Sequence, residues 1–264
     1  MKKKIVLFSF VMLIFCLGGC AFRNRGNTDI AKKELTMTEE EAELLLKIFP
    51  ADYDVEKIES GELFSYQERM LLLYRASLDY LSEKYPDYHF DFVGGTPKNT
   101  WGSPYYKFQI CETGSEDIYG IYIRLEEGAV TITDNFYGVV IRESYDSYVY
   151  HEFSGEIDSL VGIYSVFPSP KELDSFTMTE ITDGSIYLSP QTAVYLTGPV
   201  VSETEWEEMA SQVEKIIIDR KIYGYYSIYY LPDIPGDISD GESCRSYMES
   251  NGCLYDYKFP NWKP

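Results

Sequence analysis

The hydrophobic period changes repeatedly along residues 36–264, and this limits the folds that the chain can adopt. Leu71, Tyr74, Leu78, Leu81 and Tyr85 recur every three or four residues, which is typical of one face of an amphipathic helix. In "DYHFDF" and "IYGIYIRL", by contrast, the period is two, as in a half-buried strand. We therefore expect an α+β fold in which short antiparallel strands form one or two sheets, with three to four amphipathic helices packed against one face.

Capping motifs indicate where the helices begin. A Ser or Thr is followed three residues later by Glu at three places, the pattern of a capping box: Thr38–Glu41, Ser65–Glu68 and Ser202–Glu205. A fourth helix is expected after Asp134, whose carboxylate would accept from the first free backbone N–H groups. The order of the elements allows two closely packed halves within the body of residues 36–264, with a boundary near 155–160.

The first nineteen residues are typical of a secretory signal peptide. Lys2–Lys4 form a positive head, and Ile5–Leu17 follow without a charge. This apolar run is too short for a membrane span, which needs about 20 residues. An uncleaved anchor and a signal peptide without a lipid are the alternatives.

The sequence Leu17-Gly18-Gly19-Cys20 resembles the lipobox of bacterial membrane lipoproteins. The resemblance implies that the Cys20 thiol receives a diacylglyceryl group and that signal peptidase cleaves between Gly19 and Cys20. Two acyl chains anchor a protein stably, whereas one chain holds it only marginally. The expected location is the outer face of the bacterial cytoplasmic membrane. In a cell with two membranes, the outer membrane is the alternative location.

Charge is distributed unevenly along the mature chain. Loss of Lys2–Lys4 changes the net charge from −20 to −23. Residues 21–35 carry four basic and two acidic side chains, so the body from residue 36 carries −25. We interpret residues 20–35 as the lipidated cysteine followed by a flexible basic tether that is attracted to anionic headgroups. So acidic a body does not favour nucleic acid, whose phosphates require Lys and Arg.

Aromatic residues supply the candidate ligand-binding residues. The sequence has 25 tyrosines, and "YGYYSIYYL" places Tyr225 and Tyr229 on one strand face, where they could stack against a sugar or bind a peptide. Trp101 lies in a loop rich in Gly, Pro and Thr, and an exposed loop aromatic can mark a recognition site. A structural role is the simpler interpretation for all three residues.

No motif supports a catalytic residue, a metal ligand or a cofactor. The sequence lacks C-x-x-C, H-E-x-x-H and a phosphate-binding glycine loop. Its two histidines, His89 and His151, have carboxylates nearby but no nucleophile elbow. Acidic residues in the loop 232–243 fail the spacing of a calcium-binding loop and are typical of a solvated turn.

Cys244 and Cys253 are the candidate disulfide pair. Export permits oxidation, and Asn251-Gly252 favours a tight reversal just before the second cysteine. Cys111 has no obvious partner, so we expect it to be free. Two unpaired thiols are the alternative, because spacing alone does not fix pairing.

The sequence thus predicts a lipid-anchored extracytoplasmic protein with a non-enzymatic body that binds an unknown protein, peptide or saccharide. A cell-envelope hydrolase acting on cell wall or peptide is one alternative. An accessory or inhibitory protein that binds a cationic partner is the other. A deep polar pocket would favour a solute receptor, an exposed flat aromatic patch would favour the inhibitory protein, and a histidine beside a nucleophile or metal would favour the hydrolase.

Overall fold

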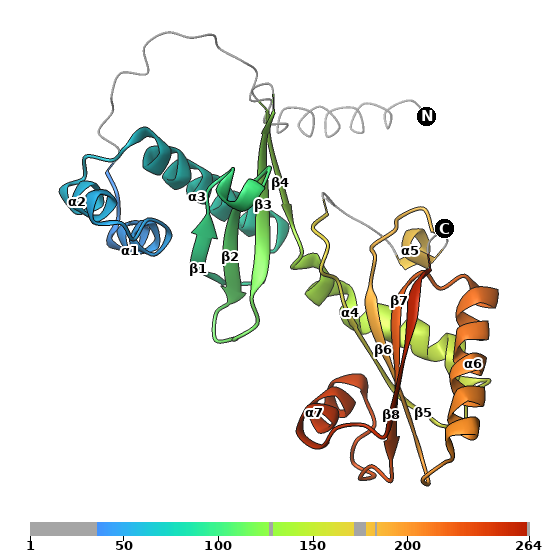
Figure 1. The fold of residues 1–264 in the computed structure, drawn as a ribbon. Helices are drawn as coiled ribbons and strands as arrows, with labels where there is room; N and C mark the ends of the chain where they lie inside the picture. Colours follow the sequence, from blue (N-terminus) through green and yellow to red (C-terminus); the bar gives the residue numbers. More distant parts are fainter. Residues whose placement is uncertain (1–35, 127–128, 172–177, 183, 263–264) are drawn as a thin grey trace, which may run out of the picture.

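The computed structural model describes residues 36–126, 129–171, 178–182 and 184–262. Two four-stranded sheets and seven α-helices make up this part of the chain, which confirms the α+β class (Figure 1). The predicted signal peptide and tether, with Gly19 and Cys20, lie outside the described residues.

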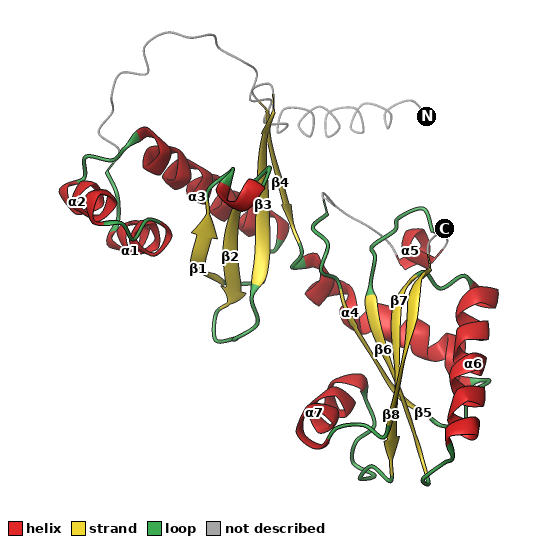
Figure 2. Cartoon of the chain, in the orientation of Figure 1, coloured by secondary structure: helices red, strands yellow, loops and turns green. Residues whose placement is uncertain are grey.

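The first sheet is an antiparallel meander with strand order β1-β2-β3-β4. Three helices precede it, and Figure 2 shows helices on one side of this sheet. The bounds are α1 Glu39–Ile48, α2 Asp52–Ser60, α3 Ser65–Lys84, β1 Phe90–Thr96, β2 Tyr106–Glu112, β3 Tyr119–Glu126 and β4 Ala129–Asp134, with a 3₁₀ turn at Thr100–Gly102.

The second sheet has the order β5-β6-β7-β8 and is mixed rather than purely antiparallel. β6 and β7 run parallel because α6 carries the chain back across the sheet between them. The bounds are α4 Tyr137–Ser154, β5 Leu160–Val166, α5 Met178–Thr182, β6 Gln191–Gly198, α6 Glu203–Arg220, β7 Gly224–Pro232, α7 Gly241–Asn251 and β8 Tyr255–Trp262.

Helices cover both faces of the second sheet, not one face as the sequence predicted. Tyr226, Ile228 and Tyr230 of β7 are buried on the side of α4 and α6, where Trp206 lies against Tyr230. α7 lies on the opposite side (Figure 1), with Cys244 buried in a smaller cluster. The short α7 covers only part of this second face.

Most of the predicted helix signals are confirmed, but that of α3 is displaced. Thr38 and Ser202 cap α1 and α6 through complete capping boxes, and Asp134 accepts from the backbone N–H of Tyr137 at the start of α4. In α3, however, the side chain of Gln67 accepts from the backbone N–H of Phe64. Phe64 is therefore the N-cap, and the helix begins at Ser65, which was predicted to be the cap itself.

The predicted apolar face of α3 was wrong at one position. Leu78 is 38% exposed, whereas Ser77 is buried in its place. The buried positions of the helix are Gln67, Met70, Leu71, Leu73, Tyr74, Ser77 and Leu81. Ser77 satisfies its buried hydroxyl by donating to the carbonyl of Leu73 at 2.8 Å.

The change from one sheet to the other occurs before α4 rather than near residues 155–160. α4 packs on β5 and α6, so it belongs with the second sheet. Phe136, just before α4, is fully buried with its ring 5.1 Å from that of Tyr85 and 4.7 Å from that of Phe90. One continuous cluster of buried apolar residues spans both sheets.

Candidate functional site

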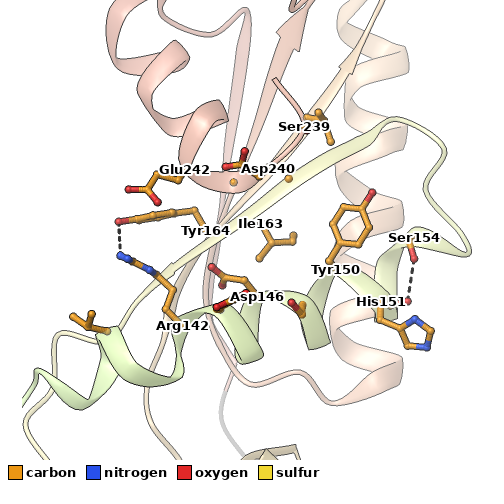
Figure 3. A pocket seen from close by; sticks show the side chains of 16 residues that line it. Arg142, Asp146, Tyr150, His151, Ser154, Ile163, Tyr164, Ser239, Asp240 and Glu242 are labelled. Atoms are coloured by element: carbon orange, nitrogen blue, oxygen red, sulfur yellow. Dashed lines mark hydrogen bonds between the residues drawn. The ribbon is translucent and has the colours of Figure 1, made fainter. Parts of the chain in front are cut away.

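A large hollow lies at the free edge of β5, between α4 and the first residues of α7 (Figure 3). We call it the edge cleft; its volume is about 760 Å³. Glycines shape one wall, because a Cβ on Gly241 would lie 1.7 Å from the carbonyl oxygen of Ile163, and one on Gly162 would lie 2.8 Å from the nitrogen of Gly241. Only glycine at these positions lets α7 approach the strand this closely.

Asp146 of α4 satisfies part of the backbone edge of β5. Its Oδ2 accepts from the backbone N–H of Ser165 at 3.3 Å. Its other oxygen is buried and has no hydrogen-bond partner among the described residues. Burial raises the pKa of Asp146 to about 6, although the bond from Ser165 and the nearby Arg142 act in the opposite direction. A carboxyl group that titrates near neutral pH therefore lines the cleft.

Tyr164 of β5 brings together two arginines from different helices. Arg142 of α4 donates to its hydroxyl at 2.9 Å, and Arg245 of α7 donates to the same oxygen at 2.5 Å. Each guanidinium also lies over the ring, 5.0 and 4.9 Å from its centroid. Figure 3 shows the bond from Arg142, with Asp146 beside it on the same helix. The ring of Tyr164 is buried, with 7% of the residue exposed.

Tyr164 also lines two smaller hollows. One, here called the junction pocket, has a volume of about 240 Å³ and lies between the β2–β3 loop at Asp117, α4 and β5, with both arginines in its wall. The other, here called the face groove, has a volume of about 450 Å³ on the second face of the sheet beside α7. The three hollows meet at one tyrosine with two cationic neighbours.

The face groove contains two of the predicted ligand-binding residues. Tyr225 is 44% exposed and Tyr229 is half-buried, with its ring stacked on that of Tyr195 at 5.6 Å. Both line the groove together with Ser227, so the predicted alternation of faces along β7 is correct. The third predicted residue, Trp101, lies in the turn between β1 and β2 of the other sheet, and its side chain lies outside the described residues.

The predicted disulfide is not formed, and Cys244 and Cys253 are both free thiols. The chain does not reverse near Cys244 but continues as α7 to Asn251. At about 1.5 Å per residue, this stretch of helix is longer than the roughly 7 Å that a disulfide allows between Cα atoms. Cys244 is buried against the sheet and Cys253 is exposed; Cys111 is free, as expected.

Neither histidine is paired with a nucleophile in the described part of the chain. His89 is exposed just before β1. His151 lies at one end of the edge cleft, and Figure 3 shows its ring turned away from Asp146. The nearby Ser154 donates to the backbone carbonyl of His151 and not to its ring.

The central residues of the site were missed by the sequence interpretation. Arg142 and Asp146 are four residues apart on the predicted fourth helix, so a shared helix face was the one available signal. Tyr164 and Arg245 are far apart in sequence and carry no motif. Asp240 and Glu242 are exposed, as predicted for a solvated turn, and they also line the cleft. Asp240 caps α7, and the bond from the Ser243 N–H lowers its pKa.

The described residues contain no group of three His, Cys, Asp or Glu side chains placed to hold a metal ion. None of the helices among them is long and apolar enough to cross a membrane. Comparisons with family models, with curated proteins and with solved structures found no match for this chain.

Proposed function

We propose that this chain is a bacterial lipoprotein, anchored through Cys20 on the outer face of the cytoplasmic membrane, whose body binds a ligand in the hollows around Tyr164. The lipobox-like sequence and the basic tether support the anchoring. The observation that carries the binding role is the convergence of Arg142 and Arg245 on the Tyr164 hydroxyl, where three hollows meet.

A polar hollow supports a receptor for a solute or short peptide more than a flat docking surface. The edge cleft is lined by charged and hydroxyl side chains together with the apolar Val139, Val161 and Ile163. Small-ligand sites are concave, and convergent polar groups in them fix the orientation of the ligand. The exposed ring of Tyr225 extends the site along the sheet.

Two experiments test the two parts of this proposal. Cells are labelled with a clickable fatty acid, and the wild type is compared with Cys20→Ala; equal labelling would contradict anchoring through Cys20. Separately, the Tm of the mature protein in detergent is measured with each of a panel of amino acids, sugars and short peptides. Compounds that raise the Tm are then tested with the Arg142→Gln variant. If no compound raised the Tm of the wild type more than it raised the Tm of Arg142→Gln, the binding role would be wrong.

A further inference from the structure

Resting on the proposed binding function, we infer that the ligand is a zwitterion with an amino-acid or short-peptide backbone, whose carboxylate lies against Arg142, Arg245 and Tyr164. Its ammonium group would extend into the acidic part of the edge cleft. A carboxylate matches the two guanidinium groups and the Tyr164 hydroxyl, and an ammonium group matches the carboxylates that line the edge cleft.

The Tyr164 hydroxyl has more hydrogen-bond donors around it than acceptors. Its oxygen accepts from both Arg142 and Arg245, so its own proton must be donated elsewhere. No acceptor for this proton is found among the described residues. The Tyr164 proton is therefore a donor without an acceptor in this part of the chain, on a side chain that is more than nine-tenths buried. Unsatisfied polar groups of this kind point to an acceptor supplied by a ligand.

The positive charges of Arg142 and Arg245 lie close together. Both terminal nitrogens donate to one oxygen, so they are no farther apart than the sum of the two bond distances. Arg245 is paired with Glu249 at 2.8 Å. Arg142 makes no ion pair within the described ranges, although its charge acts on the nearby Asp146. Two guanidinium groups this close repel each other, and an anion bound between them would relieve the repulsion. A carboxylate accepts from an arginine fork through both oxygens.

The edge cleft does not suit a ligand that is only anionic. The edge cleft also presents Glu143, Asp146, Asp240 and Glu242, and these carboxylates would repel a phosphate or a dicarboxylate. An ammonium group is attracted to them. The exposed ring of Tyr150, which lines the same cleft, offers an additional face to a cation.

Size supports an amino acid or a short peptide. The edge cleft of about 760 Å³ and the junction pocket of about 240 Å³ share Val139, Arg142 and Tyr164 in their walls. The volume of the edge cleft falls in the range of ordinary small-ligand sites, about 300–1,000 Å³, and the junction pocket adds a smaller space beside it. The shared arginine places the carboxylate where the two hollows meet, and leaves the larger hollow for side chains and the ammonium group.

The test uses the mature full-length protein in detergent and three mixed-sequence tripeptide libraries. One library is unblocked, one is amidated at the C-terminus and one is acetylated at the N-terminus. After rapid gel filtration, peptides retained by the protein are quantified by mass spectrometry. We expect retention from the unblocked library, loss of at least about tenfold on amidation, because charge-assisted bonds are lost, and a weaker loss on acetylation.

Variants connect this result to the site. Arg142→Gln and Tyr164→Phe should each lower retention of unblocked peptides at least about tenfold, and the unchanged ring in Tyr164→Phe keeps the packing. Arg124→Gln is the matched control, because Arg124 also lies over a tyrosine, Tyr105 at 5.3 Å, but on β3 away from the hollows. Its retention should equal that of the wild type.

Three outcomes would overturn the inference. They are no retention from the unblocked library, equal retention of unblocked and amidated peptides, and equal retention by wild type and both site variants. The inference and the proposed function can fail separately. If a sugar or another compound that is not a zwitterion raised the Tm and Arg142→Gln abolished the effect, the binding role would stand and the zwitterion would be wrong.

Discussion

Lys84 Nζ lies 2.7 Å from Oδ2 of Asp134, whose side chain is completely buried. Lys84 ends α3 and Asp134 ends β4, so the pair fastens the first helical layer to the strand that leads into α4. Tyr85 donates to the other carboxylate oxygen at 2.8 Å, and the same oxygen accepts from the backbone N–H of Tyr137. One carboxylate thus joins α3, β4 and α4.

Replacing Asp134 with Ala should lower the free energy of unfolding by about 3–5 kcal/mol, because it leaves a largely buried ammonium group without its partner. Urea denaturation followed by circular dichroism measures the change. Lys57→Met is the control, since the exposed Lys57–Glu62 pair should contribute little. Equal losses in both variants would show that the buried pair has no special role.

Asp146→Asn should stabilise the protein above pH 6 and have little effect near pH 4. The folded-state pKa of Asp146 is raised from 3.8 to about 6 by burial, so the folded protein binds more protons than the unfolded chain between these values. Through this group, wild-type stability falls as pH rises across that window. The gain above pH 6 should be on the order of 3 kcal/mol, at about 1.4 kcal/mol per pKa unit.

Urea titrations of wild type and Asp146→Asn at pH 4, 5, 6 and 8 measure this difference. Asp240→Asn serves as the control of opposite sign, because the pKa of Asp240 is lowered by the bond from the Ser243 N–H. Its carboxylate stabilises the protein above its unfolded pKa, and this contribution is lost as pH falls through the folded value. A constant difference between Asp146→Asn and wild type at all pH values would contradict the raised pKa.

Gly241→Ala should displace α7 and expose Cys244. The added Cβ would lie 1.7 Å from the carbonyl oxygen of Ile163, a distance that backbone atoms cannot tolerate. In the wild type, Cys244 is fully buried and its burial raises the thiol pKa to about 11, so it should react slowly with a thiol reagent. Labelling kinetics with site identification by mass spectrometry measure the change.

Gly236→Ala is the matched control for this experiment, because nothing lies within 4 Å of a Cβ at that position. Labelling of Cys244 should be faster in Gly241→Ala than in either Gly236→Ala or wild type. If all three proteins reacted at one rate, the close approach of α7 to β5 would not hold the helix in place.

Mature protein denatured without reductant should contain three alkylatable thiols, Cys111, Cys244 and Cys253, because the structure has no disulfide among them. Intact mass after alkylation, with and without prior reduction, counts them. A single alkylatable thiol before reduction and three after it would instead support the bridge between Cys244 and Cys253 that the sequence spacing predicted.

Local patterns were sufficient for the starts of α1, α4 and α6 and for the faces of β7. A capping box is a contact within one turn, so Thr38 and Ser202 were identified from spacing alone. The alternation of Tyr225 and Tyr229 with Tyr226 and Tyr230 follows directly from the pleat of a strand. The failures at Leu78 and Ser65 are shifts of one residue, and such shifts depend on what packs against the helix rather than on local spacing.

The sequence by itself determined the α+β class, the boundaries of the capped helices and the tyrosine alternation, since these depend on residues within a few positions of each other. Tertiary structure alone decided that β6 and β7 run parallel, that α7 lies on the second face, and that Arg142 and Arg245 meet at Tyr164. The contact at Tyr164, for example, joins residues from three separate elements, α4, β5 and α7. Their contacts depend on how the chain crosses the sheet, which no local period specifies.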